Sequence, residues 1–464
     1  MGDAMEIVIG RQIAVSNPSS QLLVWCEQNL VLPNPEFEKK LRMGFWTGNT
    51  PRTLSLYEIR GNRLFLPYGT LAQLAPCLNN GSVRSEFVTS PTIDYSGEPM
   101  ELYPYQERAV QALLNAKYGI LQSPAGSGKT QMGIELIKRF RLPALWLTHT
   151  KDLLQQSKSR ALRYIDPELI GSITEGKVNI SRGVTFATVQ TMSNLDLEQY
   201  RDLWPVIIVD ECQHAAGTPT MVTRFSRVLN SLAAPYKFGL SATVHRSDGL
   251  IKSVYALLGS IVYQVPDEAV KERIMKVSVC PVGTGVTMTD DCLKSDGTLD
   301  YAGMINVLCI EEARNRLIVN TLDAHADRPS LILSERLDHL SHLMDLLPED
   351  MRQHACMVSG KTKKVERDAA IEDMRCGRRQ YLFATWALAK EGLDMPRLEA
   401  LYMATPAKDE AVVIQAVGRV ARVSEGKSEP VVFDFVDLIP YCRRAYKERL
   451  KHYRRLGAYV GIES

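Results

Sequence analysis

The sequence predicts an α/β protein in which two tandem domains each hold a parallel sheet with helices on both faces. A chain of 464 residues is too long for one hydrophobic core, so two or three domains are expected. Short, almost entirely apolar segments alternate with helical segments across residues 98–268, and the same rhythm returns from residue 300 to 464. Apolar runs of this kind are typical of strands that are buried on both faces of a parallel sheet.

Residues 1–97 precede this rhythm and mix short strands with short helices, which predicts an accessory α+β domain that is a candidate for binding DNA. The predicted elements are a strand within 6–15, a hairpin of 54–59 and 63–67 joined by Gly61-Asn62, and a short helix at 71–78. The segment 90–99 is rich in turn residues, so we expect it to be the linker to the next domain.

The first α/β domain is expected at residues 98–268 and the second at residues 269–464. The strands expected in the first are 118–123, 144–149, 184–188, 206–210 and 237–243. The strands expected in the second are 330–334, 354–360, 380–385, 400–405 and 430–435. Residues 283–300 are polar and predict a loop or small insertion, and the chain closes with a basic helix.

Composition limits the class of partner and the compartment. Hydrophobic residues make up 45% and charged residues 23% of the chain, and the formal net charge is only +2, so a polyanion would have to meet local basic patches. Nine scattered cysteines form no C-x-x-C pair, which favours reduced thiols over a metal framework. With no secretory pattern and no apolar run of membrane-spanning length, we expect the cytoplasm, or the host cytoplasm for a viral protein.

The segment SPAGSGKT, residues 123–130, lies between an apolar strand and an amphipathic helix, which is the setting of a phosphate-binding loop. Ser123 stands where the pattern G-x-x-x-x-G-K-[ST] has its first glycine, a position that needs a small residue more than a positive φ. Gly126 and Gly128 allow backbone N–H groups to approach phosphates closely. Lys129 would supply positive charge to the β- and γ-phosphates, and Thr130 a hydroxyl to Mg²⁺.

The segment VIIVDECQH, residues 206–214, is an apolar strand that ends in two carboxylates. Asp210 is placed to hold Mg²⁺ through water, and Glu211 to act as the general base on the attacking water. A pair of acids at a strand end is common on protein surfaces, but following a phosphate loop it predicts an ATP site.

At this point the sequence resembles the superfamily 2 DExH-box helicases, and the resemblance covers most of residues 100–435. The segment D-E-C-Q-H matches the second motif of that family, so Gln213 and His214 would couple the ATP site to nucleic acid. The resemblance implies two RecA-like domains that clamp ATP between them, with binding closing the cleft and hydrolysis reopening it.

Other motifs of the family follow in the same order. The segment 102–110 resembles the motif whose glutamine reads adenine, here Gln106, and Tyr103 replaces the usual arginine and could stack on the base. The nucleotide-binding residues implied are Tyr103, Gln106, Ser123, Gly126, Ser127, Gly128, Lys129, Thr130 and Asp394. The residues implied to contact the nucleic-acid backbone are Thr148, Thr188, Gln190 and Thr385, and those implied in coupling are Gln213, His214, Ser241, Thr243 and Gln415.

In the second domain, the segment 383–396 resembles the motif that would contain Thr385, Glu391, Gly392 and Asp394. The segment QAVGRVAR, residues 415–422, resembles the arginine-finger motif of the family. Steps of four and three residues predict that Gln415, Arg419 and Arg422 share one helical face. The two guanidinium groups would stabilise transition-state charge on the γ-phosphate.

DNA is favoured over RNA as the substrate. Residues 241–265 resemble the stretch after the S-A-T motif in XPB-like and UvsW-like DNA helicases, a match carried by Arg246, Asp248 and Gly249. The order of domains is similar to that of bacteriophage branch-migration helicases. The RNA-directed DEAD-box proteins end their second motif in D-E-A-D, which this chain lacks.

Three surfaces could meet the phosphates. The segment KTKK, residues 361–364, is one, and residues 441–455 carry seven basic residues and one acid, which predicts either a nucleic-acid surface or an ordinary solvated helix. The third is a cluster of Arg42, Phe45, Trp46 and Arg52, which is either a junction-contacting surface or an aromatic core.

The function that these motifs favour is an ATP-dependent DNA helicase or translocase that remodels forks and Holliday junctions in recombination or repair. The alternatives are an RNA-dependent DExH ATPase, the duplex-translocating motor of a restriction-type complex, and an ATP-gated binding module. The presence of Glu211, Arg419 and Arg422 speaks against the last. Oligomeric state stays open, and a monomer is compatible with the motifs.

Overall fold

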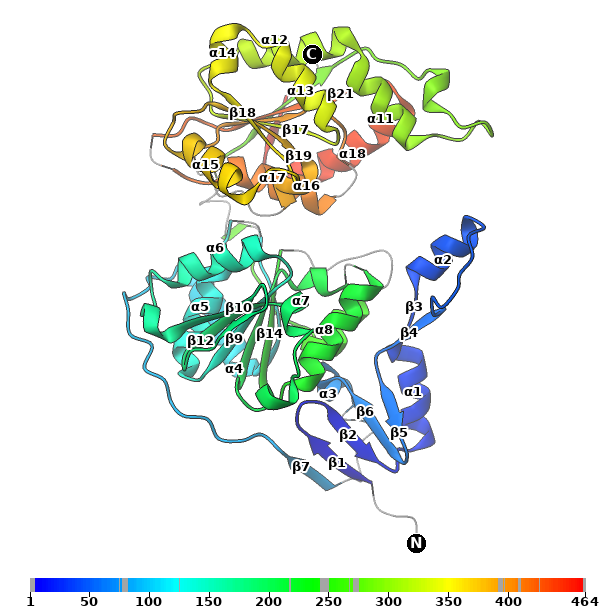
Figure 1. The fold of residues 1–464 in the computed structure, drawn as a ribbon, viewed down its shortest axis with the longest axis vertical. Helices are drawn as coiled ribbons and strands as arrows, with labels where there is room; N and C mark the ends of the chain where they lie inside the picture. The colour runs from blue at the N-terminus through cyan, green and yellow to red at the C-terminus, as the bar shows by residue number, and fades with distance from the viewer. Residues whose placement is uncertain are drawn as a thin grey trace. The chain divides into compact units, whose positions relative to one another are not determined.

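The computed structural model describes residues 5–74, 76, 82–124, 126–216, 218–242, 250–266, 268–269, 275–390, 395, 397–407, 410–424 and 426–461. It divides the chain into two compact units, Met1–Val265 and Pro266–Ser464. Each unit is built on a sheet of mainly parallel strands, and unit 1 begins with a separate mixed sheet, so the predicted fold class is confirmed (Figure 1).

The mixed sheet at the start of unit 1 has the strand order β5-β6-β2-β1-β7. Its strands are β1 (Glu6–Ile9), β2 (Ile13–Ser16), β5 (Glu58–Arg60), β6 (Arg63–Leu66) and β7 (Ser82–Ser85). The single strand predicted within 6–15 is a hairpin, because the chain turns at Gly10, whose N–H donates to the Gln12 carbonyl. The turn at Gly61-Asn62 does join a hairpin, β5 with β6.

The first predicted strand of that hairpin is divided between two sheets. Only β5 pairs with β6, while β4 (Thr53–Ser55) pairs with β3 (Val31–Pro33). The helices of this region are α1 (Ser20–Leu30), α2 (Pro35–Arg42) and α3 (Leu71–Leu74), with the short helix η1 (Tyr68–Thr70) before α3. The helix predicted at 71–78 is thus present in its first turn, and most of the remainder lies outside the described residues.

We call residues 31–55 the N-terminal arm: β3, α2, the loop that follows α2, and β4. Figure 1 shows the arm extending away from the N-terminal sheet. Helix α2 has no buried residue, and Phe45 and Trp46 are 61% and 88% exposed. The alternative that these aromatic side chains form a core is therefore wrong, because the arm contributes too few neighbours to bury them.

The main sheet of unit 1 has the strand order β11-β10-β12-β9-β13-β14-β8-β15, and all neighbours are parallel except β11 with β10. Its strands are β8 (Tyr118–Gln122), β9 (Ala144–Thr148), β10 (Ile170–Thr174), β11 (Lys177–Asn179), β12 (Val184–Thr188), β13 (Val206–Asp210), β14 (Tyr236–Ser241) and β15 (Ile261–Gln264). The helices are α4 (Pro104–Ala116), α5 (Lys129–Phe140), α6 (Lys151–Ala161), α7 (Val189–Met192), α8 (Pro219–Ser231) and α9 (Ile251–Leu258). All five predicted strands are present.

The N-terminal region and the main sheet of unit 1 share one hydrophobic core. Arg11 pairs with Glu198 at 2.7 Å, and the Tyr68 hydroxyl donates to the Pro235 carbonyl at 3.1 Å. Lys237 of β14 is 1% exposed, and its Nζ donates to the Leu229 carbonyl at 2.7 Å and to the Arg11 carbonyl at 3.3 Å. A buried lysine thus ties the N-terminal hairpin turn to the main sheet.

The sheet of unit 2 has the strand order β18-β19-β17-β20-β21-β16-β22, with parallel neighbours throughout. Its strands are β16 (Ser278–Gly283), β17 (Ser330–Ser334), β18 (Ala355–Val358), β19 (Tyr381–Thr385), β20 (Ala400–Met403), β21 (Val431–Val436) and β22 (Tyr459–Val460). The helices are α11 (Tyr301–Ile310), α12 (Glu312–Asp323), α13 (Leu337–Asp345), α14 (Glu349–Gln353), α15 (Lys364–Arg375), α16 (Trp386–Lys390), α17 (Glu410–Val420) and α18 (Pro440–Arg455). Strands β16 and β22 were not predicted.

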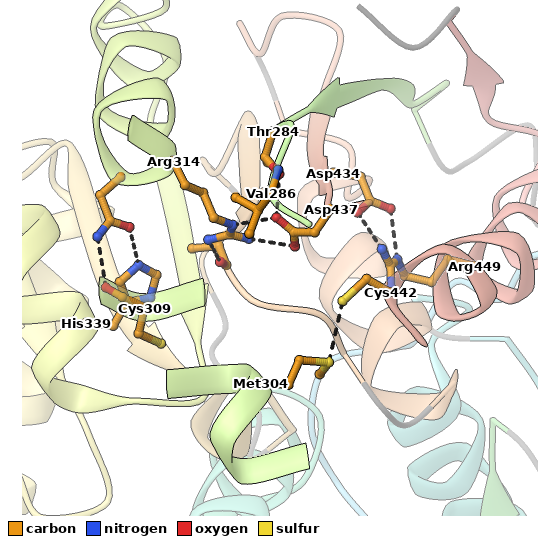
Figure 2. Close-up of polar contacts among 12 residues, drawn as sticks. Thr284, Val286, Met304, Cys309, Arg314, His339, Asp434, Asp437, Cys442 and Arg449 are labelled. Carbon is orange, nitrogen blue, oxygen red and sulfur yellow. Dashed lines mark hydrogen bonds and ion pairs between the residues drawn. The ribbon is translucent and has the colours of Figure 1, made fainter. Parts of the chain in front are cut away.

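Two buried ion pairs attach helices α12 and α18 to β21 and to the residue that follows it (Figure 2). Arg314 of α12 donates to Asp437 at 2.7 Å and to the Ala404 carbonyl at 2.7 Å. Arg449 of α18 donates twice to Asp434 of β21, at 2.9 and 2.7 Å. Removing one partner of such a pair leaves an unpaired buried charge, which typically costs about 3–5 kcal/mol.

Helix α18 is amphipathic as predicted. Tyr453 is buried against β21 and donates to Asp434 at 2.8 Å. The basic side chains on the opposite face are exposed, namely Arg443, Lys447, Lys451 and Arg454. No helix in the part of the chain that the structure describes is both long enough and apolar enough to span a membrane.

We predict that Lys237 makes the stability of unit 1 depend on pH. Burial lowers its pKa from 10.5 to about 7, so between these values the unfolded chain binds more protons than the folded one and stability rises with pH. Relative to Lys237→Met, the wild-type free energy of unfolding should therefore increase by about 1 kcal/mol per pH unit from pH 7.5 to 9 in urea titrations.

Lys252→Met is the matched control, because Lys252 is exposed on α9. Its difference from wild type should not vary over this pH range. A constant difference for Lys237→Met would show that the buried amine keeps its proton.

Candidate functional site

The phosphate loop joins β8 to α5 at the carboxyl edge of the main sheet of unit 1. Gly126 and Gly128 both adopt left-handed backbone conformations, with φ of 81° and 82°, and Gly128 is the N-cap of α5. Ser123 Oγ lies 2.5 Å from Ser127 Oγ, which closes the loop across its base. A serine at the first position thus adds a hydrogen bond where the usual glycine has no side chain.

The loop is braced from α4. The Gln106 amide donates to the Ser127 carbonyl at 2.9 Å, and its oxygen accepts from the Tyr103 N–H at 3.0 Å. The Tyr105 hydroxyl donates to the same Ser127 carbonyl at 2.9 Å. A Cβ at Gly128 would lie 2.4 Å from the Gln106 amide nitrogen, so this glycine is needed for the close approach.

The two residues predicted to recognise adenine differ in how accessible their side chains are to a ligand. Gln106 is 2% exposed and both ends of its amide are already bonded to backbone. The Tyr103 ring is 42% exposed and stacks on Tyr105, with ring centroids 6.1 Å apart. Recognition of the base by Gln106 and Tyr103 stays a prediction.

Lys129, Asp210 and Glu211 converge at the carboxyl ends of β8 and β13. Lys129 Nζ lies 3.8 Å from Glu211 Oε1 and 3.4 Å from the Ser123 carbonyl. Asp210 Oδ2 accepts from Ser157 Oγ at 3.0 Å, and its Oδ1 accepts from the Glu211 N–H at 3.0 Å. Three charged groups thus lie within one small, largely buried region.

The two carboxyl groups titrate differently. Burial and the adjacent Glu211 carboxylate raise the pKa of Asp210. Burial also opposes ionisation of Glu211, but Lys129 and the Gln213 amide outweigh it, so the pKa of Glu211 is lowered. The lowered pKa favours the ionised form of Glu211, which is the form that a general base requires. Additional positive charge nearby would favour the ionised form of Asp210 in the same way.

This arrangement fits a magnesium nucleotide. An added Cβ at Gly126 would meet none of the described residues within 4 Å, which leaves room for phosphate oxygens beside the loop. Thr130 in the first turn of α5 and Asp210 would hold the cation, as the motifs imply. When bound, Mg²⁺ neutralises charge on the β- and γ-phosphates.

A chain of hydrogen bonds leads from Glu211 to β14. Gln213 Nε2 donates to Glu211 Oε2 at 2.9 Å, and Ser241 Oγ donates to Gln213 Oε1 at 2.6 Å. Glu211 itself has φ of 48°, a left-handed conformation that is uncommon outside glycine and that clusters at functional sites. Gln213 thus contacts Glu211 directly and Ser241 is connected to it through Gln213. Thr243, which was also predicted to act in coupling, lies outside the described residues.

His214 stacks on a second histidine. The rings of His149 and His214 are 3.8 Å apart at an interplanar angle of 24°. Burial, together with His214, lowers the pKa of His149 to about 3, so this ring is neutral at physiological pH. The His149 carbonyl accepts from the Gln190 amide at 2.6 Å, which connects the acidic motif to the segment after β12.

The predicted nucleic-acid residues of unit 1 lie at the same sheet edge. Thr148 is the last residue of β9 and Thr188 the last of β12. Both hydroxyls bond locally: Thr148 donates to the Thr150 carbonyl at 2.9 Å, and Thr188 caps α7 by accepting from the Thr191 N–H at 3.4 Å. Their contact with a nucleic-acid backbone stays a prediction.

In unit 2, Gln415 and Arg419 lie on α17, but the helix ends at Val420, so Arg422 lies in the following turn. The prediction that all three share one helical face is wrong for Arg422, whose N–H donates to the Arg419 carbonyl at 3.4 Å. Thr385 is the last residue of β19. The predicted residues Glu391, Gly392 and Asp394 lie outside the part of the chain that the structure describes, as do Arg246, Asp248 and Gly249.

Sequence reasoning missed three residues that shape the site: Tyr105, His149 and Ser157. His149 stands inside the segment 147–156 that resembles a helicase motif, so its position could have been noted. The contact of Tyr105 joins α4 to the phosphate loop and that of Ser157 joins α6 to the end of β13, and only the tertiary structure reveals them.

A parallel sheet with a phosphate loop and an acid pair at its carboxyl edge, followed by a second parallel-sheet unit, defines a two-domain P-loop nucleoside triphosphatase. Comparison with known proteins narrows this class. A family profile described as "Type III restriction enzyme, res subunit" matches residues 99–246, and one described as "Helicase conserved C-terminal domain" matches residues 313–424.

Individual relatives agree with these matches. A protein of Acanthamoeba polyphaga mimivirus, named as an ATP-dependent RNA helicase, is 26% identical over 397 residues, 82% of this chain and 72% of that protein. The DNA 3'-5' translocase XPB2 of Sulfurisphaera tokodaii is 26% identical over 359 residues, 70% of this chain and 79% of that protein. The structure of Dbp5 from S. cerevisiae bound to RNA and ADP BeF3 has a TM-score of 0.53 at 18% identity, covering 77% of this chain and 89% of that one, which shows the shared fold.

The chain is thus a superfamily 2 helicase, similar to XPB-like, phage and other viral helicases, and it is an ATP-hydrolysing enzyme. The resemblance stated from its motifs is confirmed at this level.

We predict that Glu211→Gln lowers the rate of ATP hydrolysis by about 10²-fold or more, because the amide cannot accept a proton from water. Nucleotide affinity should change by no more than about three-fold, since the amide replaces the carboxylate with little change in shape. Lys129→Ala should instead weaken nucleotide binding, because it removes the positive charge beside the loop. Steady-state hydrolysis and titration with a fluorescent nucleotide separate the two effects.

Glu175→Gln is the matched control: Glu175 is also a left-handed glutamate, with φ of 54°, but its side chain is 61% exposed. It should hydrolyse ATP at the wild-type rate. If Glu211→Gln does the same, the general base has been assigned to the wrong residue.

Proposed function

We propose that this helicase uses ATP and Mg²⁺ to move along DNA and to remodel branched structures such as forks and Holliday junctions. The observation that carries the DNA assignment is similarity over most of the chain to a protein named a DNA 3'-5' translocase. The second motif D-E-C-Q-H, which differs from D-E-A-D, supports the same choice. By resemblance, residues 1–97 would serve DNA binding, residues 98–268 would bind ATP, and residues 269–464 would form the second motor domain, with the cytoplasm as the site of action.

The contact geometry of unit 1 suggests how hydrolysis is sensed. Loss of the γ-phosphate changes the charge that Lys129 and Glu211 face, and the hydrogen bonds from Glu211 through Gln213 to Ser241 carry that change to the end of β14. Ser241 is the first residue of the S-A-T motif. A shift in this chain of bonds is our proposed link between chemistry and movement.

An RNA substrate is the second candidate, because the mimivirus relative is named as an RNA helicase. The profile named for a restriction enzyme subunit keeps a duplex-translocating motor as a third. The three candidates differ in which polynucleotide stimulates hydrolysis.

The test is the ATPase rate of the full chain with single-stranded DNA, blunt duplex DNA, a four-way DNA junction and RNA of matched length. We expect the junction to give the greatest stimulation and to be converted to duplex arms when ATP is present. Stimulation by RNA alone would overturn the DNA assignment. Stimulation by blunt duplex without any conversion of the junction would favour the translocating motor instead.

We further propose that Arg419 and Arg422 stabilise the charge that develops on the γ-phosphate during hydrolysis. The proposal rests on the motif Q-A-V-G-R-V-A-R, with Arg419 in the last turn of α17 and Arg422 in the turn that follows the helix. Arg419 is 8% exposed, so its guanidinium is held close to the protein rather than free in solvent.

Arg422→Ala should lower turnover by about 10³-fold or more while nucleotide affinity stays within a few-fold of wild type. Single-turnover hydrolysis at saturating ATP measures the first and equilibrium binding the second. Arg316→Ala, which removes a 70% exposed arginine from α12, should match wild type in both. Wild-type turnover in Arg422→Ala would remove it from the catalytic set.

A further inference from the structure

The N-terminal arm presents an unusual run of exposed apolar side chains. All six residues from 41 to 46 are exposed, and four of them are large and apolar. Their exposed fractions are 62% for Leu41, 54% for Met43, 61% for Phe45 and 88% for Trp46. Single exposed apolar residues are ordinary, but a contiguous group of this kind marks a binding surface.

The arm holds these side chains in place rather than leaving them on a loose loop. Asn34 caps α2 and also donates from its side chain to the Pro51 carbonyl at 2.7 Å, which ties the start of the helix to the end of the loop. Lys40 Nζ donates to Thr50 Oγ1 at 2.7 Å, and the Phe45 N–H donates to the Lys40 carbonyl at 2.9 Å. A surface fixed in this way loses little conformational entropy on binding.

The Trp46 ring lies over the backbone of its own loop. An added Cβ at Gly48 would lie 3.1–3.3 Å from three atoms of the ring, so the absence of a side chain at this position allows the indole to pack closely on the backbone. With one face supported and 88% of the residue exposed, the ring can offer its other face to a planar partner. This is the geometry that base stacking requires.

The charges around the ring favour a polyanion. Lys39, Arg42 and Arg52 are exposed within the arm. The acids Glu36 and Glu38 lie in the first turn of α2, at the opposite end of the helix from Trp46, and Glu36 pairs with Lys40 at 3.0 Å. Lys39 and Arg42 lie in the last turn of α2, next to the loop that carries Phe45 and Trp46, whereas Arg52 lies beside Asn34 at the start of the helix. The basic residues that adjoin the aromatic side chains are therefore those at the carboxyl end of α2.

We propose that the N-terminal arm binds unpaired nucleotides, with one base stacked on Trp46, Phe45 flanking it, and Lys39 and Arg42 contacting the adjacent phosphates. The proposal rests on the proposed function, because a helicase acting at a branch point exposes unpaired bases. It adds a base-binding element outside the two motor domains. Stacking is indifferent to base identity, so the arm would recognise single-stranded character and not sequence.

Intrinsic fluorescence provides a direct test with the full-length protein. Of the five tryptophans, Trp46 is the exposed one, since Trp146, Trp204 and Trp386 are buried and Trp25 is half-buried. The difference spectrum between wild type and Trp46→Phe therefore isolates its emission. We expect a single-stranded oligothymidylate to quench this emission, and a fully paired blunt duplex with the same number of phosphates to leave it unchanged.

Affinity for the oligothymidylate separates stacking from charge. Trp46→Ala should weaken binding by about ten-fold or more, whereas Trp46→Phe should stay within about three-fold of wild type because it keeps an aromatic face. Arg42→Ala should weaken binding and also reduce its dependence on salt concentration. Tyr459→Ala, which removes another 73% exposed aromatic residue in unit 2, is the control and should bind as wild type does.

The outcomes distinguish this proposal from the proposed function. If DNA stimulates hydrolysis by wild type but oligothymidylate neither quenches Trp46 nor binds more weakly to Trp46→Ala, the arm proposal alone fails. If no DNA stimulates wild type, the proposed function fails first. If Trp46→Ala changes only the sedimentation coefficient of the protein, the arm is a contact between copies of the chain and the nucleotide proposal is overturned.

Discussion

The site depends on one constraint: the strands of a parallel sheet all end at the same edge. Because β8, β13 and β14 are neighbours in unit 1, their last residues meet there although they are far apart in the sequence. This places the phosphate loop after β8, the acid pair after β13 and Ser241 of β14 within reach of hydrogen bonds, such as that from the Ser123 N–H to the Ser241 carbonyl at 2.8 Å. A different order of strands would separate these groups without changing any of the residues themselves.

Burial then decides how the charged groups at this edge behave. Charges taken out of water interact strongly, and each must find a partner or change its protonation state. Lys129 and the Gln213 amide favour the ionised form of Glu211, while burial and Glu211 raise the pKa of Asp210, and a bound Mg²⁺ would supply the positive charge that favours the Asp210 carboxylate. The hydrogen bond that Ser241 donates to Gln213 connects this group of side chains to β14.

Unit 1 combines this buried sheet edge with the exposed N-terminal arm, and the two differ in how their side chains are held in place. The edge is largely buried, and Asp210 accepts a hydrogen bond from Ser157 of α6 while Glu211 lies 3.8 Å from Lys129 of α5. The arm buries almost nothing, yet it is ordered by bonds such as that from Asn34 to Pro51, so its aromatic residues are held in solvent. Aromatic and basic residue types predicted a cluster at this place in the chain, but composition could not say whether the cluster pointed inward or outward.

The sequence by itself determined the fold class and the strands that bear the motifs, because apolar runs and motif spacing are local properties. It also selected Lys129, Asp210 and Glu211, which the structure brings together at one sheet edge. It failed where distant segments decide: the hairpin at Gly10, the strands β16 and β22, the end of α17 before Arg422, and the bonds that occupy Gln106. Only the tertiary structure shows that His149 stacks on His214, that Ser157 donates to Asp210 and that Trp46 is exposed. The physical reason is that a side chain's partner depends on packing between elements, which a one-dimensional pattern does not specify.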